Sequence, residues 1–284
     1  MNVNTPSLPH FALEDIDLEQ RIGHGNASVF KATMGGKAIA VKKMDWDKNE
    51  VPREVEMHYT LPPHPNVLPL LGVAKDGLAI YIGMELADKS LYHLLHTEKQ
   101  QPSLRRSIKW AMQIARGVNH VHQHGLAHRD LKSANVLLFE KEDITKVCDF
   151  GSAQPLDCTA TMTGMAGTYR WMAPELNDKG SMKVNQFSDV FSYGMILYEI
   201  FAQKVPFFDV VDSAVVASSI RDGKRPSIPP TLPPYITMLM EFCWKQTPDE
   251  RPTFEKIIKV SSVEHFNIAS STHFRPINST FRSV

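Results

Sequence analysis

The spacing of apolar and polar positions changes part-way along the chain. From residue 18 to about residue 86, short runs of alternating apolar and polar residues predict β-strands. Two of these runs, residues 26–34 and 37–44, flank the pair Gly35-Gly36, which is a strong signal for a β-hairpin. One helical stretch, residues 49–61, interrupts the strands, and a proline-rich sequence ends it. The N-terminal part is therefore predicted to be mostly β-sheet with one helix.

From about residue 88 onward, apolar residues recur at the spacing of helices. The clearest case is residues 103–124, where Ser103 is suited to cap the start and Gly125 to end the helix. The apolar residues that fall on one face of this helix are Leu104, Ile108, Ala111, Ala115 and Val118. Further helices are predicted over residues 187–201, 234–245 and 253–266.

These patterns predict an α+β fold with two parts. A small, mostly antiparallel β lobe with one helix is expected at about 16–86, and a large, mostly helical lobe at about 88–262. A leader is expected at residues 1–15, and its polar, proline-bearing part, residues 1–13, is predicted to be loose. The tail at residues 263–284 is polar and rich in Ser and Thr. Any chemistry on a phosphate group is expected where the two lobes meet.

The composition narrows the functional classes. The 284 residues are 43% hydrophobic, which is enough for a substantial core. The 31 basic and 31 acidic residues give a formal net charge of zero, so the chain has no overall charge suited to nucleic acid or an anionic membrane. The most apolar late run, residues 191–202, contains Glu199 and is too short to cross a bilayer. We therefore expect neither a nucleic-acid partner nor membrane insertion.

The cysteines and the N-terminus indicate the compartment. Cys148, Cys158 and Cys243 are widely spaced, odd in number and without a C-x-x-C pair. This usage argues against a disulfide framework or a structural zinc site and fits a reducing compartment. The first residues lack the charged and apolar regions of a secretory signal. A cytoplasmic protein is predicted.

The sequence IGHGNASVF at residues 22–30 is close to the phosphate-binding pattern G-x-G-x-x-G. Ser28 stands where the third glycine is expected. Two nearby glycines are a weak signal, so three interpretations stay open from this stretch alone. It is a nucleotide site that tolerates a serine, a site that has lost its catalytic use, or a chance hairpin.

Four motifs along the chain decide between these interpretations. They are AVK at residues 40–42, HRDLKSAN at 128–135, DFG at 149–151 and APE at 173–175. In this order and at these intervals, the set resembles the protein kinase family over about residues 16–262. The resemblance implies a two-lobed protein kinase fold, ATP and Mg²⁺ as cofactors, and a protein substrate.

The resemblance also assigns the phosphate-holding pair. Phosphoryl transfer is mostly positioning and charge neutralisation, so a strand lysine such as Lys42 suits the α- and β-phosphates. Glu54 matches the helical glutamate that holds this lysine, with Glu56 as a rival. His58 then stands where the family places an apolar residue near the DFG phenylalanine. This departure makes the active arrangement weaker or pH-sensitive, or else His58 is a neutral, hydrogen-bonded histidine.

The remaining catalytic roles follow the same motif positions. Asp130 corresponds to the residue that orients the attacking hydroxyl, and Lys132 to one that meets the γ-phosphate. Asn135 and Asp149 correspond to the ligands of Mg²⁺, which prefers oxygen donors. Taken singly, each would be an ordinary surface carboxylate, cap or solvated lysine.

The nucleotide contacts that the resemblance implies run from the glycine loop to the hinge after residue 84. They are Ile22, Gly23, Gly25, Val29, Ala40, Lys42, Met84 as gatekeeper, Glu85, Ala87 and Leu137 as the apolar floor. Ser28 retains the backbone N–H that such loops offer to phosphate, at the cost of a Cβ where the backbone sometimes needs unusual φ. We expect weaker ATP binding and a less mobile loop, and not an inactive enzyme.

Further residues indicate the kind of kinase. Lys132 favours transfer to serine or threonine, and GTYRWMAPE at 167–175 resembles the tyrosine-kinase-like group of serine/threonine kinases. Within that group, CDFGSAQ and TATMTG, at 148–154 and 159–164, are most similar to mixed-lineage and transforming-growth-factor-β-activated kinases, which are MAP kinase kinase kinases. The resemblance thus implies a MAP kinase kinase as the substrate, and the sequence does not identify the upstream activator.

Two other functions compete with this prediction. A catalytically weak or inactive kinase-fold scaffold, acting by protein binding, is motivated by Ser28 and His58 and opposed by the complete catalytic set. A tyrosine-specific enzyme is disfavoured by Lys132.

Regulatory and supporting positions complete the resemblance. Thr161 or Thr163, or else Thr159, is a candidate for phosphorylation, with Arg129 binding the added charge; otherwise the three are solvated loop residues. Cys148 is either open to an electrophile in the ATP site or an inert buried side chain.

Three more positions match structural residues of the family. Glu175 and Arg251 match a buried salt bridge, and Asp189 an aspartate that braces the catalytic loop. Phe191 replaces the tryptophan that is usual at its position.

Overall fold

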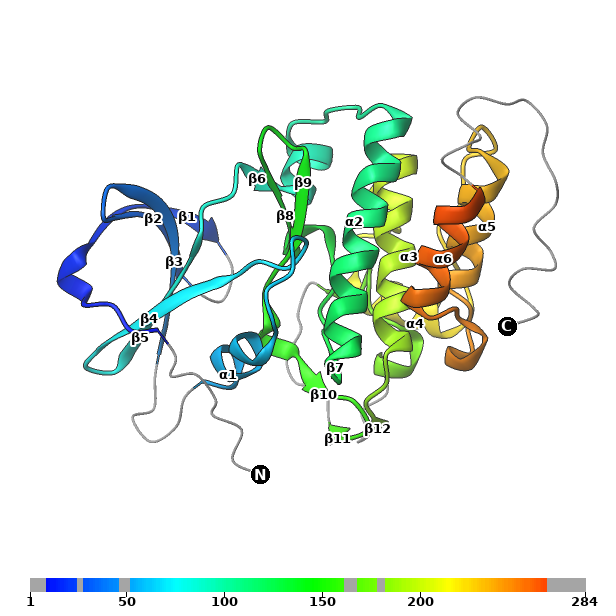
Figure 1. The fold of residues 1–284 in the computed structure, drawn as a ribbon. Coiled ribbons are helices and arrows are strands. Elements are labelled where there is room, and N and C mark those ends of the chain that lie inside the picture. The colour runs from blue at the N-terminus through cyan, green and yellow to red at the C-terminus, as the bar shows by residue number, and fades with distance from the viewer. Residues whose placement is uncertain (1–8, 25–27, 46–51, 161–167, 178–181, 265–284) are drawn as a thin grey trace.

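The protein has two lobes, a β-sheet lobe and a helical lobe, as predicted (Figure 1). The computed structural model describes residues 9–24, 28–45, 52–160, 168–177 and 182–264. The larger hydrophobic core lies in the helical lobe, and smaller apolar clusters fill the sheet lobe and the region between the two.

The N-terminal lobe is a five-stranded antiparallel sheet in the order β1-β2-β3-β5-β4. The strands are β1 (Ile16–His24), β2 (Ser28–Met34), β3 (Lys37–Asp45), β4 (Leu70–Asp76) and β5 (Ala79–Glu85). The predicted hairpin is confirmed, because Met34 pairs with Lys37 across a two-residue turn. Gly35 and Gly36 both have positive φ, 56° and 75°, which the tight turn requires and glycine permits.

The leader is not loose in its described part. The Phe11 N–H donates to the Val73 carbonyl oxygen (3.1 Å), and the Val73 N–H donates to the Pro9 carbonyl oxygen (2.9 Å). A short helical turn, Leu13–Asp15, then leads into β1. The prediction was wrong here because the pairing partner lies far away in the sequence, where local polarity gives no sign of it.

The helix α1 (Arg53–Thr60) is the single helix of the described part of the N-terminal lobe. It lies within the predicted span of 49–61 and begins directly after Pro52, as a helix can. Residues 49–51 lie outside the described residues. The helix packs against the turn Phe150–Ser152, so it is in contact with the DFG motif.

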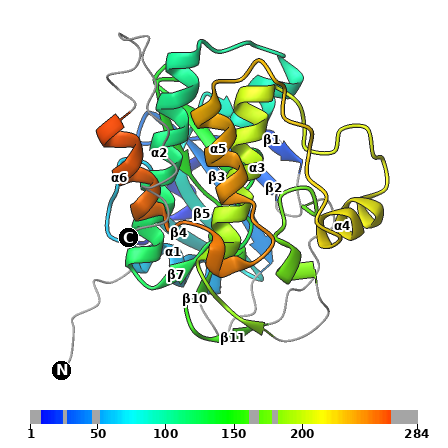
Figure 2. The same cartoon turned by 90° about the vertical axis from the view of Figure 1, so that its right-hand side faces the viewer.

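The C-terminal lobe contains α2 (Leu104–Gln123), α3 (Phe187–Ala202), α4 (Ser213–Arg221), α5 (Pro234–Cys243) and α6 (Phe254–Glu264). The Ser103 hydroxyl accepts from the Arg106 N–H, and Gly125 has φ 75°, so the predicted ends of α2 are confirmed. The sequence interpretation missed α4. Helix α3 lies between α2 and α5 in Figure 1, and α5 lies in front of it in Figure 2, which explains why almost all residues of α3 are buried.

Short elements connect the lobes and carry the motifs. Strands β6 (Lys89–Ser90), β8 (Val136–Phe139) and β9 (Ile144–Val147) form one small sheet. Strand β7 (Leu126–Ala127) pairs with β10 (Gln154–Pro155), and β11 (Thr159–Ala160) pairs with β12 (Met182–Lys183). The short helical elements are His93–Thr97, Ser133–Asn135, Pro174–Asn177 and Pro248–Glu250. The HRD and DFG motifs therefore lie at the ends of these short strands, next to the sheet lobe.

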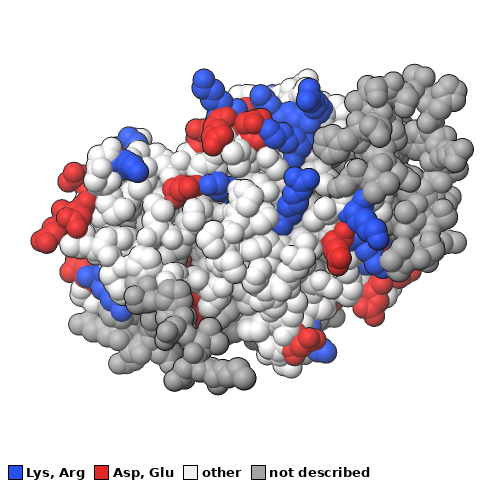
Figure 3. Space-filling view, viewed as in Figure 1, with Lys and Arg blue, Asp and Glu red and all other residues white. Residues whose placement is uncertain are grey.

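Charges of both signs are interspersed on the face in Figure 3, with a wide uncharged area between them. Among the residues that the structure describes, no helix combines the length and apolar character that crossing a membrane requires.

Candidate active site

Lys42 is held between two carboxylates from different parts of the chain. Its Nζ lies 2.5 Å from Glu54 Oε1 on α1 and 3.0 Å from Asp149 Oδ1 in the DFG motif. Burial alone would lower the pKa of Lys42, but Asp149 and Glu54 outweigh it and keep this pKa above its ordinary value. Glu56 is exposed, so Glu54 is the partner of the lysine.

The two carboxylates respond differently to this environment. Burial raises the pKa of Glu54, and Lys42 offsets only part of that effect. Burial also acts to raise the pKa of Asp149, but Lys42 overcomes it and the pKa is lowered. Asp149 is thus held as a carboxylate, with its backbone in the left-handed region at φ 67°.

A second cluster is built around Asp130. Its Oδ2 accepts hydrogen bonds from Lys132 Nζ (2.8 Å) and Asn135 Nδ2 (3.2 Å). Lys132 Nζ also donates to Thr168 Oγ1 (3.1 Å), which links the catalytic loop to the segment before APE. Asp130 Oδ1 is buried and has no hydrogen-bond partner among the described residues. One oxygen of this carboxylate is therefore positioned by the protein and the other is available.

The loop that carries Asp130 is braced by Asp189, as predicted. Asp189 Oδ1 accepts from the Arg129 N–H (2.7 Å), and Oδ2 accepts from the His128 N–H (2.8 Å) and His122 Nε2 (2.8 Å). Burial acts to raise the pKa of Asp189, but the hydrogen bond from His122 outweighs it and the pKa is lowered. His122, which sequence reasoning missed, completes this brace from α2.

Three of the side chains predicted to contact the nucleotide lie in one apolar cluster. Met84, Ala87 and Leu137 pack with Leu68 and Cys148 between β5 and β8. Ala40 of β3 is buried and pairs with Met84 across the sheet.

The other hinge prediction concerns Glu85. Its side chain forms an ion pair with Lys146 of β9, which leaves its backbone groups as the part able to contact a ligand.

Comparisons with known proteins agree with this geometry. A profile of the family described as "Protein tyrosine and serine/threonine kinase" matches residues 16–260. The chain belongs to the protein kinase family. It is 35% identical to mitogen-activated protein kinase kinase kinase 7 of Drosophila melanogaster over 254 residues, 87% of this chain and 37% of that protein.

Two other relatives have similar identities. They are serine/threonine-protein kinase STY17 of Arabidopsis thaliana (31% over 255 residues, 87% of this chain and 44% of that protein) and mitogen-activated protein kinase kinase kinase 12 of Rattus norvegicus (32% over 271 residues, 92% and 29%). These relatives confirm the resemblance to tyrosine-kinase-like serine/threonine kinases. The chain spans less than half the length of each of these relatives.

The glycine-rich stretch of this kinase domain is only partly described. Gly23, next to the last residue of β1, pairs with Val29 of β2, and a Cβ on Gly23 would lie 2.9 Å from the Val29 Cβ. Ile22 is exposed at the end of β1, and Gly25 lies outside the described residues.

Ser28 is the first residue of β2 and pairs with both its neighbouring strands. Its backbone is extended, so the expected conformational cost of its Cβ is not incurred.

The DFG phenylalanine of the kinase lies between two histidines. The ring centroid of Phe150 is 4.8 Å from that of His58 and 5.2 Å from that of His128. The Nε2 of His58 donates to the Leu68 carbonyl oxygen, and burial lowers the pKa of His58. Of the two interpretations of His58, the neutral, hydrogen-bonded histidine agrees with this hydrogen bond and this lowered pKa.

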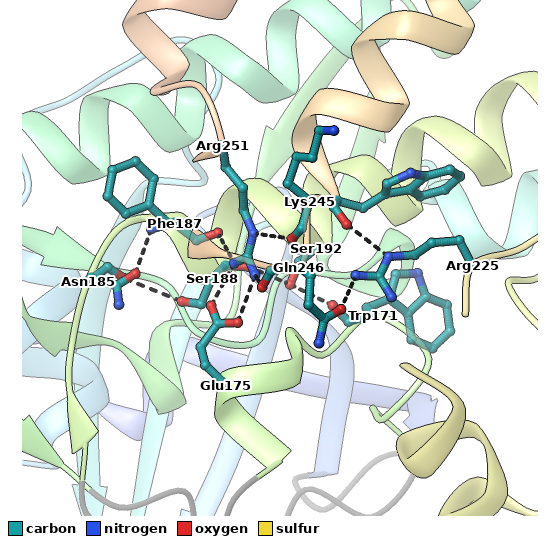
Figure 4. Close-up of polar contacts among 11 residues, drawn as sticks. Trp171, Glu175, Asn185, Phe187, Ser188, Ser192, Arg225, Lys245, Gln246 and Arg251 are labelled. Atoms are coloured by element: carbon teal, nitrogen blue, oxygen red, sulfur yellow. Dashed lines mark hydrogen bonds and ion pairs between the residues drawn. The ribbon is translucent and has the colours of Figure 1, made fainter. Parts of the chain in front are cut away.

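The predicted pair of Glu175 and Arg251 is confirmed as a two-bond ion pair, with N–O distances of 2.6 and 2.8 Å (Figure 4). Arg251 also donates to the carbonyl oxygens of Phe187, Lys245 and Gln246.

Phe191 fills the place where the family usually has tryptophan. Its ring lies 4.9 Å from the Arg225 guanidinium carbon and 5.1 Å from that of Arg251. Two cations thus face one ring, an arrangement that cation–π attraction stabilises.

Sequence reasoning missed the role of Glu199. This carboxylate is fully buried in α3 and accepts from Trp171 Nε1 (2.6 Å), the Ser133 hydroxyl (2.6 Å) and His96 Nε2 (2.9 Å). It therefore connects the APE region, the catalytic loop and the helical element 93–97. The available signal was a single glutamate in an apolar run, because such a buried charge requires partners.

The proposed phosphorylation sites are mostly outside the described residues. Thr161 and Thr163 lie there, and Thr159 is exposed in β11, paired with Lys183.

Cys148 is buried, and its Sγ lies 3.4 Å from the Asn135 carbonyl oxygen. Burial raises the pKa of this thiol far above the ordinary value. All three cysteines are free thiols.

The donor set suits Mg²⁺ that arrives with a nucleotide. Asp149 offers a carboxylate, and the Asn135 amide nitrogen is committed to Asp130, which leaves its amide oxygen as a ligand atom. Mg²⁺ usually takes one or two protein oxygens together with substrate phosphates and water. In the described ranges, no three or more His, Cys, Asp or Glu side chains gather to form a metal site. The carboxylate of Asp149 and the amide oxygen of Asn135 are a donor set that fits Mg²⁺ bound together with ATP.

Proposed function

We propose that this domain is an ATP-dependent serine/threonine protein kinase, transferring the γ-phosphate of ATP to serine or threonine of a protein. One observation carries the proposal: Lys42 is paired with both Glu54 and Asp149. The paired lysine and glutamate are one requirement of an active kinase, and the DFG aspartate in reach of the nucleotide site is the other.

The nucleotide is assigned to the space between β1–β3 and the apolar cluster. Mg²⁺ and ATP supply a transferable phosphoryl group whose negative charge the metal partly neutralises. Lys42 binds the α- and β-phosphates, and Asn135 and Asp149 hold the metal. The other nucleotide contacts are Ile22, Gly23, Gly25, Val29, Ala40, Met84, Leu137 and the backbones of Glu85 and Ala87.

Asp130 is assigned to the substrate hydroxyl. Its Oδ1 is buried and available, so it orients the hydroxyl and accepts its proton. The hydroxyl oxygen then forms a bond to the γ-phosphorus, and the bond from that phosphorus to the oxygen of ADP breaks. Lys132, bonded to Asp130, neutralises charge on the transferred group.

The specificity and pathway rest on finer similarities. Lys132 and its bond to Thr168 support serine or threonine as the acceptor. The relatedness to two MAP kinase kinase kinases supports a MAP kinase kinase as substrate. Free thiols support a cytoplasmic location.

Phosphorylation of Thr161 or Thr163 is proposed to order the loop through Arg129, and phosphopeptide mass spectrometry of active protein tests it.

The first experiment compares the parent with Asp130→Asn. Both are incubated with labelled ATP, Mg²⁺ and a generic basic protein, and the labelled amino acids are identified. We expect the parent to label serine and threonine, and the variant to lose about 10²- to 10⁴-fold in kcat with little change in ATP affinity, because Asp130 acts on the hydroxyl.

Transfer to tyrosine would contradict the specificity. ATP binding without transfer, by protein already phosphorylated between residues 151 and 167, would support the scaffold function instead.

A further inference from the structure

Two neighbouring glycines lie on the face of the N-terminal sheet that is turned away from α1. Gly72 of β4 and Gly83 of β5 are register partners. They share a face with Ala74 and Tyr81, because side chains alternate between the two faces of a strand. This is the face of the apolar cluster that includes Ile39 and Val41, opposite the face that packs on α1. Paired glycines contribute no cross-strand contact, so the sheet is weak at this point.

Phe11 of the leader covers both glycines. A Cβ on Gly83 would lie 3.0 Å from Phe11 Cε1, and a Cβ on Gly72 would lie 3.0 Å from Phe11 Cδ1. The ring therefore occupies the volume that two side chains would otherwise fill. An aromatic ring over glycine in a sheet restores the missing packing.

The ring is held there by backbone pairing. The Phe11 N–H and the Pro9 carbonyl oxygen both bond to Val73, and His10 forms a parallel bridge with the same residue. Residues 9–11 thus extend the sheet beside β4, where an unpaired edge would otherwise lie. Leu13 packs against the same apolar cluster but meets neither glycine.

Gly83 directly precedes Met84 and Glu85. Met84 points to the opposite face and packs with Ala87 and Leu137, the residues assigned to the adenine. Phe11 therefore contacts β5 from behind, at the point where the strand becomes the hinge. We propose that Phe11 is a positioning residue for nucleotide binding, which holds Met84 and the Glu85 backbone in place through Gly83. This inference rests on the proposed function, because it concerns the same nucleotide site.

The test compares Phe11→Ala with Leu13→Ala, a matched loss of an apolar side chain from the leader. MgATP affinity is measured by calorimetry, and the backbone exchange of residues 83–87 by hydrogen–deuterium exchange without nucleotide. We expect Phe11→Ala to raise the MgATP Kd about five- to tenfold and to increase exchange at 83–87. Leu13→Ala is expected to change neither the MgATP Kd nor the exchange at 83–87. Phe11→Leu is expected to keep part of the affinity that Phe11→Ala loses.

A double-mutant cycle tests the contact itself. Gly83→Ala places a Cβ against the Phe11 ring and is expected to weaken MgATP binding as Phe11→Ala does. In the Phe11→Ala background the space is open, so Gly83→Ala is expected to add less than twofold. If the fold-changes in Kd of the two single variants simply multiply in the double variant, the contact between Phe11 and Gly83 is not the cause of the weaker binding.

Failure of the inference and failure of the proposed function give different results. If the parent binds MgATP and Phe11→Ala binds it equally, with unchanged exchange at 83–87, the positioning role is wrong. If the parent binds no MgATP, the proposed function is wrong. A lower kcat for Phe11→Ala with an unchanged MgATP Kd would also contradict positioning at the adenine. The adenine contact is present before and during transfer, so its loss must weaken binding.

Discussion

At the scale of single residues, His58 shows how surroundings decide charge. Its ring packs on Phe150, and its Nε2 donates to the Leu68 carbonyl oxygen, so the neutral form is satisfied. Burial lowers its pKa first of all, and the charges of Lys42 and His128 act in the same direction. The Leu68 hydrogen bond and the Asp149 carboxylate oppose this shift without reversing it.

This lowered pKa predicts a pH effect on stability. Below the unfolded-state pKa of about 6.5, the unfolded chain binds a proton that folded His58 resists, so stability rises with pH in this window. As pH falls from about 7.5 to about 5.5, the parent is expected to lose stability relative to His58→Leu, by up to about 1.4 kcal/mol per pH unit.

Urea unfolding at several pH values measures this difference. The variant His93→Leu, at an exposed position, controls for the loss of a histidine. A difference between the parent and His58→Leu that stays constant with pH would contradict the prediction.

At the scale of elements, sequence patterns placed most of the helices to within a few residues. The apolar face of α2 and its caps predicted its ends, because both signals are local. The motifs likewise identified Lys42, Asp130 and Asp149, which the fold brings together. The docking of Phe11 on β4 and the partners of Glu199 were not predictable, because they depend on residues distant in the sequence. Helix α4 was missed although the sequence carries a local signal for its start, since Asp212 caps it by accepting from the Ala214 N–H.

The packing of α2 gives a second prediction. Gly117 lies inside this helix, where alanine usually stabilises by about 1 kcal/mol. Here a Cβ would overlap the Asn66 carbonyl oxygen. Asn66 cannot easily shift, because that oxygen accepts from the Val147 N–H (2.9 Å) and its side chain donates to the Thr145 carbonyl oxygen (2.9 Å). We expect Gly117→Ala to lower the free energy of unfolding by about 1–3 kcal/mol.

Chemical denaturation of Gly117→Ala beside Gly194→Ala measures this effect. Gly194 also lies inside a helix, but its nearest neighbour is the Cys243 side-chain Cβ at 3.0 Å, so the cost there is expected to be smaller. A gain in stability for Gly117→Ala would show that α2 and the segment before β4 separate more easily than their contact suggests.

At the scale of the whole molecule, the reactivity of the three thiols depends on whether the lobes stay packed together. Cys148 lies in the apolar cluster shared by β5 and β8, and Cys243 lies in the core of the helical lobe. Both are buried, and burial raises the pKa of each thiol far above its ordinary range, which removes the reactive thiolate. Cys158 is partly exposed. The structure therefore favours the inert interpretation of Cys148 over its reaction with an electrophile.

We expect native protein to react with iodoacetamide at Cys158, and Cys148 and Cys243 to react at least about 100-fold more slowly, because they must wait for opening of the fold. Peptide mass spectrometry over a time course measures each site, with urea-unfolded protein as the reference for full reactivity. Since Cys148 sits between the lobes, its labelling at low urea before that of Cys243 would reveal separation of the lobes ahead of unfolding of the helical core. Labelling of native Cys148 as fast as Cys158 would contradict the closed junction between β5 and β8.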